Sequence, residues 1–450
     1  MTKEELLAKK VSLISLGCDK NTVDSERILY NINQFGFGVT PNAHEAQIII
    51  VNTCAFIEPA RLESIGKIKE VLQYKNKTAE KIIVVGCLPA KSNFDFKNVL
   101  PGVDLTLGTR SYEEIISAIC KLYNIVPKQN KNNSPCARIV STPRHYAYLK
   151  IADGCDNKCS YCTIPQIRGR YKSEPLEKLL AEATELAKQG VKELILVAQD
   201  VTRYGEDLYK KHRIVELVQE LSKIEGIQWI RLHYCYPEFF SEQLINEMAT
   251  NPRVCKYVDI PIQHINDDIL KSMNRASTCN RVVGLLSKLK QKMPDVSIRT
   301  SIIVGFPGED NARFKQLEQF LTEYKLDNVG FFAYSKEYDT VAYNLEHQVP
   351  ESTKQKRLNK LVQIQADIQY NKCKQLLNKT LTCICDDETA DYYIMRTQYS
   401  SPEIDNFVYV KKDNVVCHIG EFYNVKMVDV VEPFDLKGEI IWIHQTNFRF

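Results

Sequence analysis

Short apolar runs alternate with amphipathic stretches over the first 123 residues of the chain. The apolar runs, which indicate strands, are 11–16, 48–51, 82–85 and 103–107. The amphipathic stretches, which indicate helices, are 25–35, 59–74 and 112–122. Continuous apolar strands that alternate with helices are typical of a parallel sheet covered on both faces. The pattern therefore predicts an α/β domain with an open parallel sheet over residues 1–125.

A polar linker separates this domain from a second series of strands and helices. Residues 127–143 are rich in Asn, Lys, Pro and Ser and can bury little apolar surface, so we place the linker at 126–143. Six further strands are predicted at 146–151, 193–198, 228–233, 257–261, 296–304 and 328–333. Six strand–helix units over residues 144–374 fit a partial β/α barrel, because a complete eightfold barrel typically needs about 250 residues.

The pattern changes again towards the C-terminal end of the chain. A helix is expected at 353–374, and no helical pattern follows it. Short strands are predicted at 380–385, 392–397, 406–410 and 423–431. A succession of short strands without intervening helices predicts a small all-β barrel over residues 375–440.

The composition adds one unusual number, which is the cysteine content. The chain has 450 residues, of which 15 are cysteine, and an odd total excludes complete disulfide pairing. A chain of this length builds a core without disulfides, which leaves metal binding, thiol chemistry or plain packing. The 59 basic and 56 acidic residues nearly balance, so the net charge points neither to a nucleic acid nor to a membrane surface.

The apolar runs also bear on the cellular compartment. None approaches the roughly 20 residues of a membrane span. Residues 13–18 resemble the end of a bacterial lipoprotein signal, but the apolar stretch 11–16 is shorter than the core of such a signal. We therefore expect a cytoplasmic protein without a membrane partner.

Three cysteines with C-x₃-C-x₂-C spacing stand just after the first predicted strand of the second domain. These are Cys155, Cys159 and Cys162, called the loop triad below. Active-site loops of β/α barrels follow the C-terminal ends of strands. Three thiolates can hold three irons of a four-iron cluster and leave the fourth iron open to a ligand. A zinc site usually needs a second cysteine pair or histidines, and the closest following histidine is His212. The spacing favours a cluster over zinc or three core cysteines.

A second set of cysteines lies in the first domain. Cys18, Cys54 and Cys87, called the strand-end triad below, each stand at the end of an apolar run. The C-terminal strand ends of an open parallel sheet form one edge, where ligands bind, so these thiols are expected to converge on a metal or cluster site. Packing is the alternative, because free cysteine is among the most buried residue types. The other nine cysteines have no partner at ligand spacing, and we expect them to be core residues.

Nearly the whole chain resembles the radical S-adenosylmethionine (SAM) methylthiotransferases. The matching segments are 15–27, 51–57, 84–88, 148–169 and 298–309. Members of this family combine a domain that bears an auxiliary cluster, a radical-SAM domain and a C-terminal β-barrel called TRAM. The resemblance implies two [4Fe-4S] clusters, an auxiliary one on the strand-end triad and a radical-SAM one on the loop triad.

The resemblance also implies a reaction. The open iron on the loop triad would bind SAM, and reduction by a flavodoxin-type or ferredoxin-type donor would yield a 5′-deoxyadenosyl radical. The auxiliary cluster would carry a sulfide that a first SAM methylates, and the methylthio group would then join the substrate radical. Residues in or near predicted strand ends are expected to hold SAM: Gln199, Asp200, Arg231, Gln263, Arg299 and Gly305. For the polar ones, pairing within the protein is the alternative, whereas the glycine would let a ligand approach the backbone.

The family has two main branches, which differ in substrate. One modifies an adenosine beside the tRNA anticodon, and the other modifies the β-carbon of an aspartate in ribosomal protein S-twelve of the small subunit. Between residues 379 and 433 the chain has five basic and ten acidic residues, whereas an RNA-binding barrel should be basic. An acidic barrel suits a basic protein target, and an acidic surface that is merely solvated is the alternative.

Segments 233–237, 259–264 and 402–405 also resemble the protein-modifying branch. We therefore expect a ribosomal-protein aspartate methylthiotransferase whose partner is the ribosomal protein or the small subunit, with direct RNA binding less favoured. The alternatives are a tRNA methylthiotransferase and a non-catalytic RNA-binding or scaffold protein that carries clusters.

Overall fold

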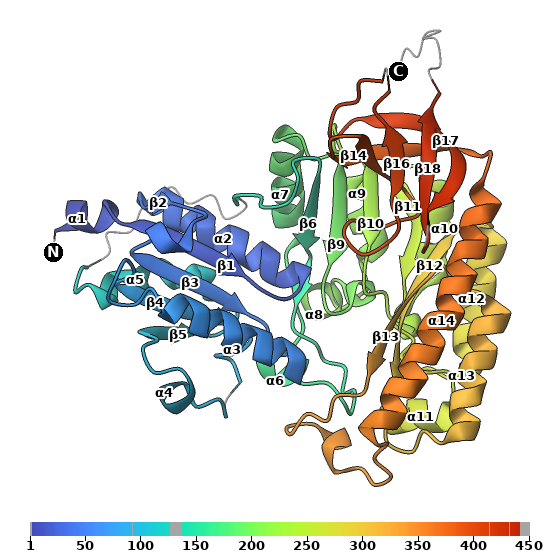
Figure 1. Ribbon diagram of the computed structural model, residues 1–450, viewed down its shortest axis with the longest axis horizontal. Coiled ribbons are helices and arrows are strands. Elements are labelled where there is room, and N and C mark those ends of the chain that lie inside the picture. Colours follow the sequence, from blue (N-terminus) through green and yellow to red (C-terminus); the bar gives the residue numbers. More distant parts are fainter. Residues whose placement is uncertain (1, 92, 127–136, 414, 432, 442–450) are drawn as a thin grey trace.

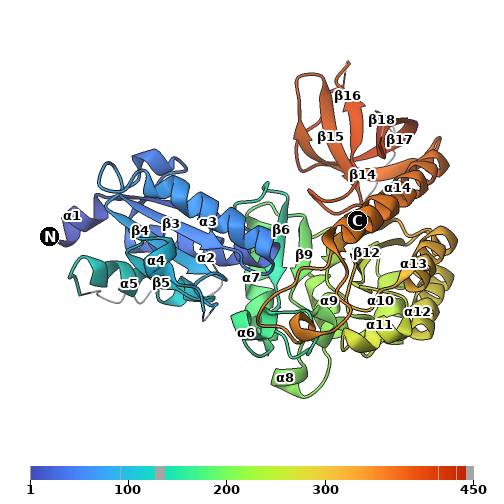
Figure 2. The same cartoon turned by 60° about the horizontal axis from the view of Figure 1, so that its bottom comes forward.

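The computed structural model describes residues 2–91, 93–126, 137–413, 415–431 and 433–441 (Figure 1). Three sheets follow one another along the chain: an N-terminal parallel sheet, a larger central parallel sheet and a C-terminal closed barrel. Figure 2 shows the N-terminal sheet beside β6, at one edge of the central sheet, and the barrel beside α14. The predicted α/β class with a C-terminal all-β barrel is confirmed.

The N-terminal domain is built on a five-stranded parallel sheet of order β2-β1-β3-β4-β5. Its strands are β1 (Lys10–Ser15), β2 (Gly38–Val39), β3 (Ile48–Thr53), β4 (Lys81–Gly86) and β5 (Leu105–Leu107). Its helices are α1 (Lys3–Leu7), α2 (Asp19–Phe35), α3 (Glu58–Leu72), α4 (Phe96–Val99) and α5 (Ile115–Leu122).

Alternate residues of β3 face opposite layers of this domain. Ile48 and Ile50 pack in one apolar cluster with residues of α2 and α5, and Ile49 and Val51 pack in another with residues of α3. Both faces of the strand are therefore covered, which is why the strand is a continuous apolar run.

The central domain is built on a six-stranded parallel sheet of order β13-β12-β11-β10-β9-β6. Its strands are β6 (Tyr146–Lys150), β9 (Glu193–Val197), β10 (Trp229–Leu232), β11 (Val254–Asp259), β12 (Ser297–Val304) and β13 (Asn328–Ala333). A short hairpin, β7 (Ala152–Asp153) and β8 (Lys172–Ser173), follows β6. Because β6 and β13 do not pair with each other, the sheet is the partial barrel that the pattern predicts.

Helices connect these strands, and most of the longer ones pack against the outer face of the sheet. They are α6 (Ile164–Arg168), α7 (Leu176–Lys188), α8 (Glu206–Tyr209), α9 (Ile214–Leu221), α10 (Glu242–Thr250), α11 (Asp267–Ser272), α12 (Cys279–Lys292), α13 (Asn311–Tyr324) and α14 (Glu351–Leu376). Figure 1 shows α14 running along β13 towards the barrel. None of the helices in the described ranges is long and apolar enough to cross a bilayer.

The C-terminal barrel closes in the order β14-β15-β16-β18-β17. Its strands are β14 (Thr380–Glu388), β15 (Tyr392–Thr397), β16 (Val408–Lys411), β17 (Phe422–Val431) and β18 (Asp435–Ile440). The pattern did not predict β18, which completes the barrel by pairing in parallel with β16 and antiparallel with β17.

The N-terminal domain docks on the inner face of the central sheet. Val23 of α2 packs with Tyr146 and Tyr148 of β6 and with Ile195 and Val197 of β9. Residues 127–136, which form most of the expected linker, lie outside the described residues. The end of that linker belongs to the same interface, because Arg138 is buried and forms ion pairs with Glu26 (3.1 Å) and Glu182 (3.3 Å).

Candidate functional site

The strand-end triad lies at the carboxyl ends of three neighbouring strands. Cys18 follows β1, Cys54 follows β3 and Cys87 follows β4, and β3 pairs with both of the other strands. Cys18 immediately precedes α2 and has an extended backbone, so its thiol lies at a helix N-terminus, where the helix dipole favours negative charge. Burial raises the pKa of the Cys87 thiol to about 12, and the thiols of Cys18 and Cys54 lie close enough to contribute to that rise.

Two glycines allow the loops of the strand-end triad to approach one another. Gly17 has φ +93°, and a Cβ atom added there would lie 2.7 Å from Cβ of Cys54. Gly86 has φ +94°, and a Cβ atom there would collide with Oδ1 of Asn52. Both positions therefore require glycine, for backbone conformation as well as for space.

The loop triad is held between the hairpin β7–β8 and α11. The backbone N–H of Cys155 donates to the carbonyl of Gly169 (3.1 Å), and that of Ser160 donates to the carbonyl of Met273 (2.9 Å). The hydroxyl of Ser160 also donates to the carbonyl of Ser272 (2.7 Å). Burial raises the pKa of Cys155 to about 11. These contacts fix the loop although it has little regular secondary structure.

The donor chemistry of both triads fits iron–sulfur clusters. The six cysteines of the two triads are free thiols. Buried thiols with raised pKa values need a nearby cation to become thiolates, and iron supplies such a charge. Within the described ranges, no group of three or more His, Cys, Asp or Glu side chains is arranged to hold a single metal ion. A four-iron cluster instead distributes its three cysteine ligands over three iron atoms.

Two predicted SAM residues follow β9, near the loop triad. Asp200 is buried, and burial raises its pKa to about 6. Its Oδ2 atom lies 3.4 Å from Nδ2 of Asn157, a residue inside the cysteine loop. The side-chain oxygen of Gln199 is buried and has no hydrogen-bond partner among the described residues. Gln199 therefore offers a polar atom that the protein leaves unused.

Gln263 and Gly305 follow the carboxyl ends of β11 and β12, and Gln263 extends the sheet pairing. The backbone of Gln263 exchanges hydrogen bonds with Ser301 and Ile303, both 2.8 Å. Gly305 has φ +70° and donates its N–H to Oε1 of Glu309 (2.9 Å). A Cβ atom on Gly305 would collide with the stem of Lys354 from α14, so this glycine makes room for Lys354.

Arg231 and Arg299 lie where the central sheet meets the C-terminal barrel. Nε of Arg231 donates to Oε1 of Glu193 (2.7 Å), and its Nη2 has no hydrogen-bond partner among the described residues. The guanidinium of Arg299 lies 3.7 Å from Asp259 and 3.7 Å from Asp405. Both arginines thus form ion pairs within the protein, and a role in SAM binding stays a prediction for them.

The barrel contributes a loop, residues 398–405 (the barrel loop below), to this interface. Tyr257 donates its hydroxyl proton to Asp405 (2.8 Å), and Tyr146 donates to Glu403 (2.8 Å). Nε2 of His233 lies 2.9 Å from the hydroxyl of Ser401. The barrel loop therefore contacts β6, β11 and the residue that follows β10.

One polar side chain that contacts the strand-end triad was assigned no role in the sequence analysis. Arg168, at the end of α6, contacts Oδ1 of Asn21 and lies 3.8 Å from Sγ of Cys87. Asp24 of α2 forms ion pairs with Arg168 and with Lys150. The sequence shows polar residues along α2, but a helix face exposed to solvent would show the same pattern.

Three family models match successive segments of the chain, and these segments correspond in order to the three sheets. Residues 10–108 match the Uncharacterized protein family UPF0004, residues 149–321 match the Radical SAM superfamily, and residues 379–441 match the TRAM domain. A protein of Acetivibrio thermocellus named "Ribosomal protein uS12 methylthiotransferase RimO" is 45% identical over 97% of this chain and 99% of its own length. Proteins of the same name from Clostridium tetani and Flavobacterium johnsoniae are 43% and 42% identical over 96% and 98% of this chain, and over 98% and 100% of their own lengths.

The chain belongs to the radical-SAM methylthiotransferase family. Membership makes it a transferase that uses SAM and an iron–sulfur cluster. Among solved structures, the radical SAM methyltransferase TsrM from Kitasatospora setae aligns with a TM-score of 0.55 at 14% identity, over 72% of this chain and 73% of its own. The cobalamin-dependent enzyme OxsB aligns with a TM-score of 0.52 at 13% identity, over 80% and 56%. At these identities the similarity supports the fold alone.

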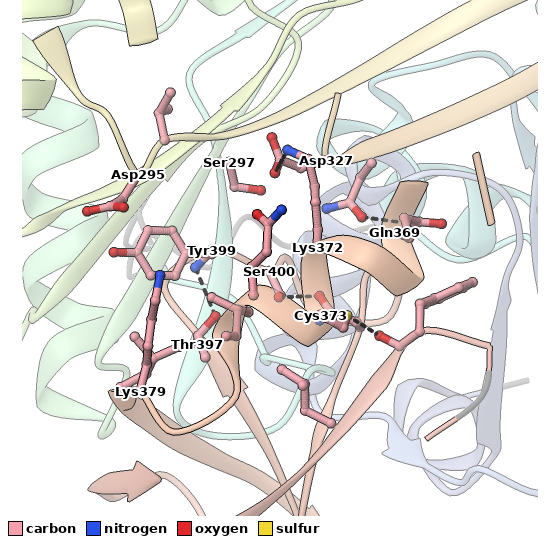
Figure 3. Close-up of a pocket in the computed structure, with 18 of the residues that line it drawn as sticks. Asp295, Ser297, Asp327, Gln369, Lys372, Cys373, Lys379, Thr397, Tyr399 and Ser400 are labelled. Atoms are coloured by element: carbon pink, nitrogen blue, oxygen red, sulfur yellow. Dashed lines mark hydrogen bonds and ion pairs between the residues drawn. The ribbon is translucent and has the colours of Figure 1, made fainter. Parts of the chain in front are cut away.

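A cavity of about 380 Å³ lies elsewhere in this methylthiotransferase (Figure 3). It forms where α14, the barrel and the first residues of β12 and β13 meet, and Ser297, Asp327, Gln369 and Lys372 are among its lining residues. The loop triad instead follows the carboxyl end of β6, and all six strands are parallel. The cavity therefore lies at the amino-terminal ends of the strands, whereas the triad lies at their carboxyl ends.

Proposed function

We propose that this chain transfers a methylthio group to the β-carbon of an aspartate in ribosomal protein uS12, with two SAM molecules and two [4Fe-4S] clusters per turnover. The observation that carries the proposal is the alignment, over 97% of the chain, with a relative whose name states uS12 methylthiotransferase activity. The two cysteine triads support it, because Thr163, which directly follows the loop triad, donates its hydroxyl proton to the carbonyl of Phe56, two residues after Cys54 (3.3 Å).

The two triads are assigned to different clusters. Cys155, Cys159 and Cys162 would hold the radical-SAM cluster, and Cys18, Cys54 and Cys87 would hold the auxiliary cluster. The first cluster supplies an electron for reductive cleavage of SAM, and the second supplies the sulfur of the methylthio group. The electron would come from a low-potential flavodoxin or ferredoxin.

The residues around the loop triad would orient SAM. Asp200 and the unpaired oxygen of Gln199 follow β9 and lie beside the cysteine loop through Asn157. A carboxylate and an amide oxygen in this place suit the hydroxyl groups of a ribose or an ammonium group. We assign SAM contacts to these two residues before Arg231 and Arg299, whose guanidinium groups already pair with carboxylates.

The charge of the C-terminal barrel supports a protein substrate. Between residues 379 and 433 acidic residues outnumber basic ones by two to one, which disfavours phosphate backbones and favours a basic target. A ribosomal protein that binds RNA is such a target. Direct RNA binding by the barrel is therefore less favoured.

The deciding measurement is the mass of ribosomal protein uS12 from cells with and without this gene. We expect the protein from complemented cells to carry one methylthio group in place of a hydrogen, on an aspartate, and that group to be absent without the gene. A methylthio group lost from tRNA, with uS12 unchanged, would assign the chain to the tRNA branch.

Iron analysis tests the two clusters independently of the substrate. The anaerobically reconstituted chain should bind about eight irons, four for each cluster. A value of about four that is unchanged when the strand-end triad is replaced by alanine would exclude the auxiliary cluster.

A further inference from the structure

The segment that leads away from the loop triad runs directly into the surroundings of the strand-end triad. Helix α6 begins two residues after Cys162 and ends at Arg168. The hydroxyl of its N-cap residue, Thr163, donates to the carbonyl of Phe56 (3.3 Å). Ile167 is buried in the apolar cluster of the N-terminal domain that includes a cysteine of the strand-end triad. Helix α6 is therefore part of the central domain in sequence but packs against the N-terminal domain.

Arg168 connects this helix to all three loops of the strand-end triad. Its Nη2 atom lies 3.8 Å from Sγ of Cys87 and donates to Oδ1 of Asn21. Asn21 in turn donates through Nδ2 to the carbonyls of Leu16 (2.8 Å) and Thr53 (3.0 Å). Those two residues directly precede the loops that carry the other two cysteines. One guanidinium thus contacts one thiol and, through a single amide, fixes the backbone beside the other two.

Arg168 also forms ion pairs with two buried carboxylates. Its Nη1 atom lies 2.9 Å from Asp153 and 3.4 Å from Asp24, and Lys150 pairs with both carboxylates. Side chains of both signs from both domains therefore surround Arg168, which is only 5% exposed, and Arg110 adds a further cation on Asp153. A side chain that is held by several charged partners has a fixed position, which is what a donor to a cluster ligand needs.

We propose that Arg168 is a positioning residue that fixes the strand-end triad relative to the loop triad and donates an N–H group to the sulfur of Cys87. The inference rests on the proposed function, because it assumes that each triad holds a cluster. Hydrogen bonds to cluster sulfurs change the reduction potential, and a nearby cation stabilises the reduced, more negative state. Arg168 therefore raises the potential of the auxiliary cluster.

The first test isolates the auxiliary cluster in the full-length chain by replacing the three cysteines of the loop triad with alanine. In this background, Arg168→Gln should shift the midpoint potential of the remaining cluster downward in an EPR-monitored redox titration. Arg168→Lys should reverse part of that shift, because it keeps the positive charge. Arg110→Gln is the matched control, since Arg110 also pairs with Asp153 (3.4 Å) across the domain interface. Among the described residues, Arg110 forms its hydrogen bonds and its ion pair with Asp153 and not with the strand-end triad, so Arg110→Gln should leave the potential unchanged.

The second test measures the distance between the two clusters in a chain that keeps all six cysteines. Magnetic coupling between the two reduced clusters should change in Arg168→Gln and stay unchanged in Arg110→Gln. Loss of the auxiliary iron from Arg168→Gln alone would also support the positioning role. If both variants lose that iron equally, or if Arg168→Gln keeps both the wild-type potential and the wild-type coupling, the inference is wrong. Absence of a cluster from the background variant itself would instead contradict the proposed function.

Discussion

Replacing Glu193 by Gln should weaken the contact between the C-terminal barrel and the central domain by about 3 kcal/mol. Glu193 accepts from Arg231 (2.7 Å) and from Arg396 of the barrel (2.6 Å), and all three side chains are fully buried. Removing one partner of a buried ion pair typically costs about 3–5 kcal/mol, because the remaining charge is neither paired nor solvated. Gln keeps one acceptor oxygen and belongs at the lower end of that range, whereas Glu193→Ala belongs at the upper end.

The interface contains its own fluorescent probe for this measurement. Trp229 is buried and packs edge-on against Phe422 of the barrel, with ring centroids 4.8 Å apart. The other tryptophan, Trp442, lies outside the described residues and would be replaced by Phe in every variant. Urea titration of the remaining emission would then report separation of the barrel from the central domain.

A matched control distinguishes the buried pair from a general charge effect. Glu185 pairs with Lys188 at 3.6 Å, and both side chains are exposed, so Glu185→Gln should change the free energy by no more than about 0.5 kcal/mol. If the urea midpoint of Glu193→Gln equals that of Glu185→Gln, the buried network does not hold the barrel in place and the reasoning fails.

Three further outcomes are expected. Burial alone would raise the pKa of Glu193, but two guanidinium groups hold that pKa below its ordinary value. Its stabilisation is therefore complete above the unfolded-state pKa and is lost as the pH falls. The urea midpoint should fall less in acid in Glu193→Gln than in the wild type, and the fall that remains comes from other paired carboxylates such as Asp386, whose pKa is also lowered. Gly17→Ala should prevent the strand-end triad from binding its cluster, because the new Cβ would lie 2.7 Å from a Cβ of that triad. The iron content should then fall to about four per chain. In the control Gly66→Ala the new Cβ meets nothing within 4 Å, and the full iron content should remain. Cys155→Ala should abolish dithionite-dependent formation of 5′-deoxyadenosine, and Cys279→Ala, on the outer helix α12, should not. Full iron in the glycine variant, or SAM cleavage in Cys155→Ala, would contradict the two cluster assignments.

Most strands of both parallel sheets could be predicted, because burial on both faces makes a strand a continuous apolar run. β3 is an example, since all six of its residues are buried. β2 was not predicted, since it has only two residues and both are exposed. β18 could not be predicted in this way, because only Leu436 and Gly438 are buried in it and charged residues alternate with them. Its place in the barrel depends on pairing with β16 and β17, which the local pattern does not encode.

Some residues of the candidate site could be predicted from the sequence, and others could not. The cysteines could be placed because parallel strands bring their carboxyl ends to one edge, whatever else surrounds them. Asn21, Asp24 and Arg168 could not, because polar residues in a helix normally indicate a solvated face, and here that face meets another domain. Arg231 was expected at a ligand site because it stands in a predicted strand, and no local feature of the sequence indicates that Glu193 and the barrel surround it.

The barrel loop has a consequence for how substrate range can change in this family. The loop contacts strands of the central sheet, and Arg396 places a second buried positive charge on Glu193. A barrel transplanted from a tRNA-modifying relative would leave that carboxylate short of a partner unless the graft also brought a matching cation. Exchange of recognition modules between branches is therefore constrained by the catalytic domain beneath them, and functional chimaeras require junctions that move the two sides of this interface together.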